Sequence, residues 1–147
     1  MEWLWGAGKG YQNIIFLTFG TGMGAGLILN GQLYSGTNDM AGEVGHIRLA
    51  DDGPIGFGKA GSFEGFCSGG GIQRLATSYA QAALKAGESL SFCPTEADLP
   101  FITTEKVAKS DDPVAREIFV LVGRRLGQGL AILIDVLNPQ RVIIGSI

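Results

Sequence analysis

Positive charge, sulfur and histidine are all scarce in this sequence of 147 residues. Eleven Lys and Arg against 14 Asp and Glu give a net charge of -3, so we expect no basic face for nucleic acid. The only basic cluster, Arg124-Arg125, is predicted to be a solvated helix edge. The two cysteines, Cys67 and Cys93, fit reduced thiols of a cytoplasmic protein better than a disulfide framework, although one bridge between them stays open.

Long apolar runs are missing as well. No run approaches the roughly 20 residues that span a bilayer, so we expect no membrane segment. The Trp3-Leu4-Trp5 start lacks a basic region and a long apolar stretch, which argues against a secretory signal. Glycine, by contrast, is abundant with 24 residues, and 46% of the residues are hydrophobic. This length and composition predict one turn-rich domain, residues 1–147, with a real core.

A first glycine-rich segment, Gly20 to Gly26, separates two apolar runs that read as strands, Ile14–Phe19 and Leu27–Leu29. Glycines in such a turn can take positive φ and let backbone N–H groups approach an anion, and the hydroxyls of Thr18 and Thr21 can donate to phosphate oxygens. The spacing matches neither a P-loop nor a dinucleotide fingerprint, because no helix follows the glycines. A phosphate-facing turn and a glycine-rich hairpin without a ligand therefore both stay open.

A second segment, Ala41-Gly42-Glu43-Val44-Gly45-His46, holds the only histidine of the chain. Its small residues leave the side chains of Glu43 and His46 free to face a shared cleft. A carboxylate that accepts hydroxyl hydrogen bonds beside an imidazole is a typical way to hold a polyol. The alternative is a structural histidine next to a solvated glutamate.

The second half of the chain is predicted to be mainly helical. Ser68 is a candidate N-cap for a helix that runs to Lys85, with Leu75, Tyr79 and Ala83 on one side. Its glycine-rich start either approaches the nucleotide side or is an ordinary cap. A polar loop then covers residues 86–100, and a short helix begins at Thr104 and includes Ala108.

Asp112-Pro113 predicts the start of a long helix, and Asn138-Pro139 predicts its end. The apolar residues between them fall close to a helical period and predict one buried stripe: Ile118, Leu121, Val122, Leu126, Leu130, Leu133, Ile134 and Leu137. A strand, residues 141–147, is expected to follow.

The sequence from Gly20 to Glu64 resembles the ROK family of sugar kinases and sugar-responsive repressors. The resemblance rests on the glycine turn, the Leu-Asn-Gly-Gln-Leu-Tyr-Ser-Gly run that follows it, the Ala-Gly-Glu-Val-Gly-His box and a later Gly-x-x-Gly-x-x-Glu. It implies an α/β fold, the actin-like, ribonuclease-H-like kinase fold with two lobes and a cleft for ATP and sugar. Residues 1–147 look like the second lobe only, and we expect the first lobe and further C-terminal helices to lie outside this sequence.

The resemblance also implies roles for individual residues. Those facing the nucleotide are the phosphate-turn residues Gly20, Thr21, Gly22 and Gly24, with Gly145 on the adenosine side. Those holding the sugar hydroxyls are Glu43, His46 and Glu64. The implied cofactors are ATP and Mg²⁺, and the implied substrate is a hexose.

In the family, three cysteines of a Cys-x-Cys-Gly-x-x-Gly-Cys-x-Glu loop join the box histidine to hold a structural zinc. Here the three positions are Ile55, Phe57 and Ser62, so His46 alone remains of the ligand set. Zinc wants four donors of this kind, and we therefore predict that the metal is absent. We expect Ile55 and Phe57 to form a buried apolar plug in its place.

The function implied for the parent protein is phosphorylation of a hexose by ATP, in the manner of a glucokinase. The family's catalytic base lies in an Asp-Asn-Asp-Ala-Asn motif just upstream of a helix, and residues 2–8 read as the end of that helix. We therefore assign no catalytic residue here and expect no turnover by these 147 residues alone. The alternatives are a sugar-sensing lobe of a repressor, an inactive fragment, or an oligomerisation lobe that dimerises through an exposed apolar face.

Overall fold

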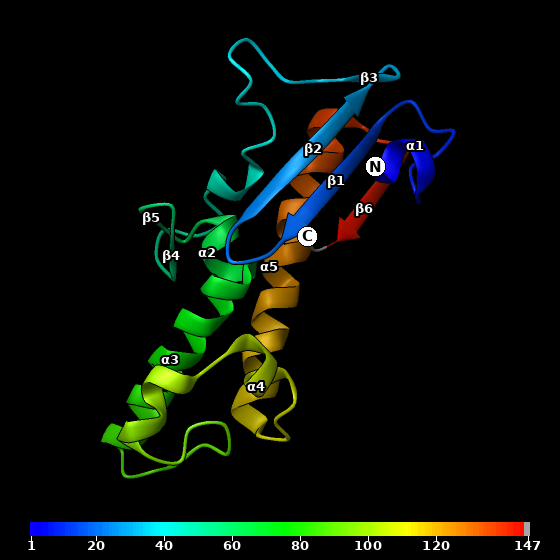
Figure 1. The fold of residues 1–147 in the computed structure, drawn as a ribbon. Coiled ribbons are helices and arrows are strands. Elements are labelled where there is room, and N and C mark those ends of the chain that lie inside the picture. Colours follow the sequence, from blue (N-terminus) through cyan, green and yellow to red (C-terminus); the bar gives the residue numbers. More distant parts are fainter. Residues whose placement is uncertain (146–147) are drawn as a thin grey trace.

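The computed structural model describes residues 1–145 as a sheet with helices packed along it (Figure 1). The helices and strands are, in chain order, α1 (Glu2–Trp5), β1 (Ile14–Phe19), β2 (Met23–Leu29), β3 (Gln32–Leu33), β4 (Ile55–Gly56), β5 (Lys59–Ala60), α2 (Phe63–Cys67), α3 (Gly69–Lys85), α4 (Thr104–Ala108), α5 (Pro113–Leu137) and β6 (Arg141–Gly145). Two 3-10 helices, η1 (Val44–His46) and η2 (Glu96–Phe101), lie in the connections. Within residues 1–145 no helix is both long and apolar enough to cross a membrane.

The main sheet is mixed and has the order β3-β2-β1-β6. β1 pairs antiparallel with β2 and parallel with β6, and its buried residues Ile15 and Leu17 point into the core shared with the helices. The turn between β2 and β3 is Asn30-Gly31, with φ of 53° and 71°, which is the left-handed pair that a two-residue hairpin prefers. The predicted strand at 141–147 is confirmed as far as Gly145, and its last two residues lie outside the described residues.

The helices begin and end where local signals place them. Asp112 caps α5 by accepting a hydrogen bond from the Val114 N–H, and Asn138 ends the helix in a left-handed conformation. Ser68 caps α3 in the same way through the Gly71 N–H. Capping residues act on backbone groups within one turn, which is why their sequence signal suffices.

The predicted stripe on α5 is correct for most of its residues and wrong for Ile134. The side chain of Ile134 is 48% exposed, whereas the preceding residue, Leu133, is buried. Successive helical residues point about 100° apart, and here Leu133 is the one of the pair that faces the core. Gly129 lies where α5 crosses α2, and a side chain there would enter the ring of Phe63.

Arg125 is also placed differently from the prediction of a solvated edge. Its guanidinium lies 4.8 Å from the centre of the Phe66 ring, and its Nη1 donates to the carbonyl of Leu49 at 3.2 Å. The neighbouring Arg124 is exposed. One residue of helical rotation thus separates a cation packed on the core from one in solvent.

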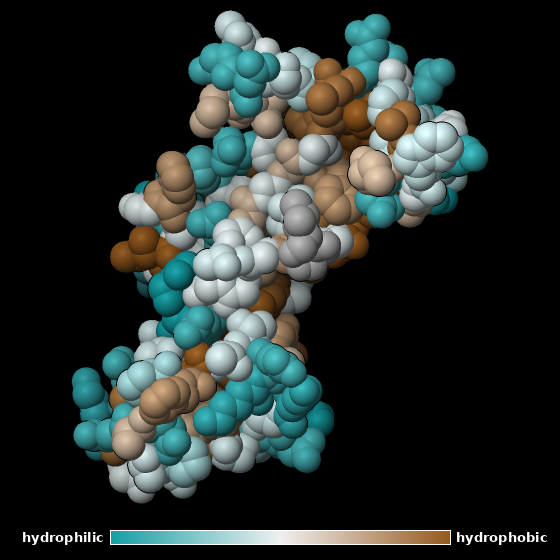
Figure 2. Space-filling model, viewed as in Figure 1, coloured by the Kyte–Doolittle hydropathy of each residue, from teal (hydrophilic) through white to brown (hydrophobic). Residues whose placement is uncertain are grey.

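The sheet face turned away from α5 remains apolar. Side chains of α1, β1 and β3, among them Phe16 and Leu33, line a hollow of about 490 Å³ there, and Leu33 is 70% exposed. Figure 2 shows apolar side chains gathered towards this end of the molecule. This surface is the kind that the oligomerisation alternative requires.

Candidate functional site

The glycine turn rests on the start of α3. The N–H of Gly69 donates to the carbonyl of Gly20 at 2.8 Å, and the N–H of Gly70 donates to that of Thr21 at 3.3 Å. A Cβ at Gly69 would lie 2.9 Å from the Gly20 oxygen, and one at Gly70 would lie 2.7 Å from the Thr21 oxygen. The glycines of α3 therefore serve this close approach, and two of its first N–H groups are occupied by the turn.

The glycines of the turn itself differ in what surrounds them. The turn is shorter than predicted, because β2 begins at Met23 and Gly24 therefore lies in the strand, paired with Thr18. None of Gly20, Gly22 and Gly24 has a φ in the left-handed region, so positive φ is not what requires them. A Cβ at Gly22 would lie 2.9 Å from a carboxylate oxygen of Glu64. A Cβ at Gly20 would meet nothing within 4 Å, and both Gly20 and Thr21 are exposed. The N–H of Gly20 donates to the carbonyl of Gly22 at 3.0 Å, so the exposed backbone of Thr21 is the part of the turn that an anion can approach.

The box of residues 41–46 is docked on the backbone of β2. The N–H of Ala25 donates to the carbonyl of Gly42 at 2.7 Å, and Gly42 has a φ of 95°. Gly45 is buried against the same strand, where a Cβ would lie 2.5 Å from the carbonyl oxygen of Met23. Both glycines of the box are therefore needed for contact with the strand that follows the turn.

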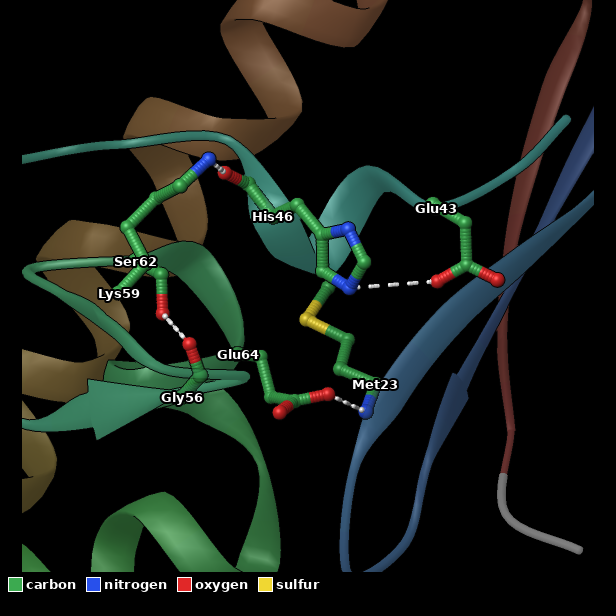
Figure 3. A network of polar contacts seen from close by, with 7 residues as sticks. All are labelled: Met23, Glu43, His46, Gly56, Lys59, Ser62 and Glu64. Carbon is green, nitrogen blue, oxygen red and sulfur yellow. Dashed lines mark hydrogen bonds and ion pairs between the residues drawn. The ribbon is translucent and has the colours of Figure 1, made fainter. Parts of the chain in front are cut away.

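Glu43 and His46 face each other across η1 (Figure 3). Oε2 of Glu43 lies 3.4 Å from Nε2 of His46, and the side chains are 48% and 26% exposed. Nζ of Lys59 donates to the main-chain carbonyl of His46 at 2.8 Å. The arrangement leaves the second carboxylate oxygen and the exposed edge of the imidazole available to a hydroxylated ligand.

Glu64 joins this pair from α2. Ser62 caps that helix, and Oε2 of Glu64 accepts a hydrogen bond from the N–H of Met23 at 2.9 Å. Met23 is the first residue of β2 after the turn. Figure 3 shows Glu43, His46 and Glu64 grouped around Met23, so the three predicted sugar residues and the glycine turn meet at the start of one strand.

Gly145 lies at the same end of the sheet. It pairs with Thr18 in the parallel β1–β6 ladder, close to the turn that begins at Gly20. A Cβ at Gly145 would lie 2.8 Å from the ring of Phe16, so a larger residue there would displace this ring.

The loop that resembles a zinc site is built differently from the prediction. Ile55 and Phe57 are 57% and 75% exposed, so the prediction of a buried apolar plug is wrong. They belong to the short β4–β5 hairpin, whose turn lies at the surface. Ser62, at the third cysteine position of the family, is buried and forms hydrogen bonds within the loop. Its hydroxyl donates to the carbonyl of Gly56 and accepts from the N–H of Gly65.

The donors present do not fit a structural zinc. Residues 1–145 contain no group of three or more His, Cys, Asp or Glu side chains placed to hold a metal. The nearby thiol of Cys67 is buried and directed at the carbonyl of Val122, and burial raises its pKa to about 12 despite the opposing charge of Arg125. Zinc binds the thiolate, which this environment disfavours.

Two neighbours of the site, Phe57 and Lys59, are missed by sequence reasoning as functional residues. Both reach His46 only because the β4–β5 hairpin folds over the box. The one local signal for Phe57 is that a large aromatic residue stands directly before Gly58, in a turn where small or polar residues are usual.

Comparison with known proteins places the chain in a family. The sequence matches the ROK family over residues 1–147. A glucokinase of Halalkalibacterium halodurans is 34% identical over 147 residues, which cover 96% of this chain and 43% of that protein. The DNA-binding transcriptional dual regulator NagC of Escherichia coli is 30% identical, over 99% of this chain and 34% of its own length.

The structural likeness agrees. The ROK family glucokinase from Streptomyces griseus in complex with glucose and AMPPNP matches with a TM-score of 0.79 and 33% identity, over 99% of this chain and 47% of that one. The chain thus spans less than half the length of these relatives. Its mixed sheet with flanking helices is that of the ROK sugar kinases, the actin-like ATPase fold. Because the family match covers every residue and the fold agrees, the chain belongs to the ROK family.

Proposed function

We propose that this chain supplies the sugar-binding box and the phosphate-facing turn of an ATP-dependent hexose kinase. The observation that carries the proposal is the hydrogen bond from the Met23 N–H to Glu64, because it joins a proposed sugar-binding carboxylate to the first residue after the turn. Phosphoryl transfer depends mainly on alignment of the acceptor hydroxyl with the phosphate. A strand that holds both parts of the site provides that alignment.

In this proposal each residue has a role that its geometry permits. The carboxylates of Glu43 and Glu64 accept hydrogen bonds from sugar hydroxyls, and the imidazole of His46 makes a further polar contact. Gly20 leaves the outer side of the turn without a side chain, so that the backbone and hydroxyl of Thr21 approach the ATP phosphates, with Gly145 on the adenosine side. Mg²⁺ bound to the nucleotide would neutralise charge on its phosphates.

The rest of the site lies, in this proposal, on residues beyond these 147. Glu43 is half exposed, and the hollow of about 620 Å³ beside α3 is lined by Pro54, Ile55 and Arg74 rather than by the sugar box. The box is therefore an open half-site that another lobe would close. We expect the 147 residues alone to show no hexose-stimulated consumption of ATP, since the base that activates the hydroxyl is supplied elsewhere.

The second candidate is a sugar-sensing lobe of a repressor, which the similarity to NagC favours. Both candidates use the sugar box, so sugar binding does not separate them. Binding of a non-hydrolysable ATP analogue does, because phosphoryl transfer needs the nucleotide and sensing does not. Saturable analogue binding favours the kinase, and sugar binding with no analogue binding favours the sensor.

The sugar box itself is tested by calorimetric titration of the chain with glucose and related hexoses. The matched variant carries Glu43→Gln and His46→Ala, and neither substitution touches the hydrogen bond from Ala25 to Gly42 that docks the box on β2. Saturable heat in the parent chain and none in the variant supports the proposal. Equal heat in both would locate hexose binding elsewhere and overturn the assignment of Glu43 and His46.

A further inference from the structure

The β4–β5 hairpin turns through Phe57 and Gly58, which have φ of 48° and 70°. Two successive residues of positive φ make the turn that Asn-Gly or Gly-Gly normally occupies. A bulky aromatic residue in the left-handed region is an outlier. Such strain persists where the surroundings hold it, and it is found most often at functional sites.

The exposure of the Phe57 side chain to solvent is a second unfavourable feature of this residue. The side chain of Phe57 is 75% exposed, so burial in the core does not explain a large apolar group there. Its ring stacks on the imidazole of His46, with the centroids 4.0 Å apart and the planes within 16°. The strained, solvent-facing residue therefore makes a specific contact with a residue of the sugar box.

Lys59, on the other side of the same turn, also contacts His46. Its ammonium donates to the main-chain carbonyl of His46, while the Phe57 ring covers one face of the side chain. Backbone and ring of His46 are thus held by one hairpin, and Nε2 still points at Glu43. With one face stacked, the imidazole has little freedom to rotate.

We propose that Phe57 is a positioning residue, which holds the imidazole of His46 towards Glu43 by stacking and so replaces the metal that the donor set of this loop does not fit. Ile55, Phe57 and Ser62 offer no zinc ligand, yet the loop keeps a defined contact with His46. The consequence for sugar affinity rests on the proposed function of the box.

Nuclear magnetic resonance provides a direct test, because His46 is the only histidine and its ring protons give unique signals. The variants are Phe57→Leu, which removes the ring, Phe57→Tyr, which keeps it, and Phe57→Gly, which suits the turn and keeps the hairpin folded. Phe101→Leu is the matched control, since Phe101 is 70% exposed and outside the site. We expect the His46 signals to be shifted by the ring current in the parent, the Tyr variant and the control, and to lose this shift in the Leu and Gly variants.

Glucose affinity is measured on the same samples. Aromatic pairs contribute enough that loss of the ring should weaken binding about two- to tenfold, and Tyr should restore it. His46 signals that are identical in the parent and in Phe57→Leu would overturn the proposal, as would stoichiometric zinc binding that moves those signals in the parent chain.

The two proposals fail in different ways. If no hexose binds to any variant but the His46 signals change as expected, the stacking stands and the proposed sugar function of the isolated chain fails. If glucose binds equally to the parent and to Phe57→Leu while the His46 signals differ, the sugar box stands and the positioning role of Phe57 is refuted.

Discussion

Replacing Gly45 with alanine tests whether the box of residues 41–46 depends on its contact with β2. The new methyl carbon would lie 2.5 Å from the Met23 carbonyl oxygen and 3.1 Å from Cβ of Glu64, where ordinary contact begins at 3.4 Å. Met23 is paired with Phe19 in the sheet, so its carbonyl cannot retreat without disturbing the ladder. The box must withdraw instead.

The cost of that withdrawal follows from the groups involved. Overpacking a tight site costs about 1–3 kcal/mol, and weakening the hydrogen bond from the Ala25 N–H to Gly42 adds about 1 kcal/mol. We therefore expect the Gly45→Ala chain to lose about 2–4 kcal/mol in the free energy of unfolding. Urea denaturation followed by circular dichroism measures it.

Gly26→Ala is the matched control. Gly26 lies in the same strand, and a Cβ there would meet nothing within 4 Å. Its free energy of unfolding should stay within about 0.5 kcal/mol of the parent value. Equal stability of the two variants would refute the docking of the box on β2, and with it the reason given for Gly45.

Two further predictions concern the turn and the buried thiol of Cys67. Gly20→Ala should leave the free energy of unfolding unchanged, because the added Cβ meets nothing within 4 Å. It should nevertheless weaken binding of a non-hydrolysable ATP analogue at least several-fold. Unchanged analogue binding would remove Gly20 from the proposed phosphate site. Burial raises the pKa of the Cys67 thiol to about 12, so its contribution to stability is fully present below the unfolded value of about 8.5 and is lost as the pH rises from there towards 12. The free energy of unfolding should therefore fall more steeply above that pH in the parent than in Cys67→Ala, and parallel curves would contradict this account.

Much of the fold follows from signals that act over a few residues. Asp112-Pro113 and Asn138 bound α5 correctly, and Ser68 caps α3 as predicted, since a cap satisfies backbone groups of the adjacent turn. The Asn30-Gly31 pair makes the hairpin that follows the glycine turn. The resemblance in turn correctly identified the family and fold of the whole chain.

The contacts that assemble the candidate site were beyond such signals. Met23 and Glu64 are 41 residues apart, and Arg125 and Leu49 are 76 apart, so no local pattern states that they meet. For the same reason the sequence favoured a buried Phe57 and a solvated Arg125, and both were wrong. Hydrophobic character predicts what a side chain prefers, while the neighbours that it finds depend on how the whole chain packs.

The sequence by itself therefore determined α3, α4, α5, β1 and β6, the family and the types of group in the box, because caps, turns and motifs are read within a short stretch. Only the tertiary structure decided that the box is docked on β2, that Glu64 closes on the turn, and that Phe57 stacks on His46. These depend on distances between segments, which backbone packing sets and composition does not. Gly45 shows how sequence and tertiary structure are connected. Glycine is needed at this position because the carbonyl oxygen of Met23, far away in the sequence, lies within contact distance in space.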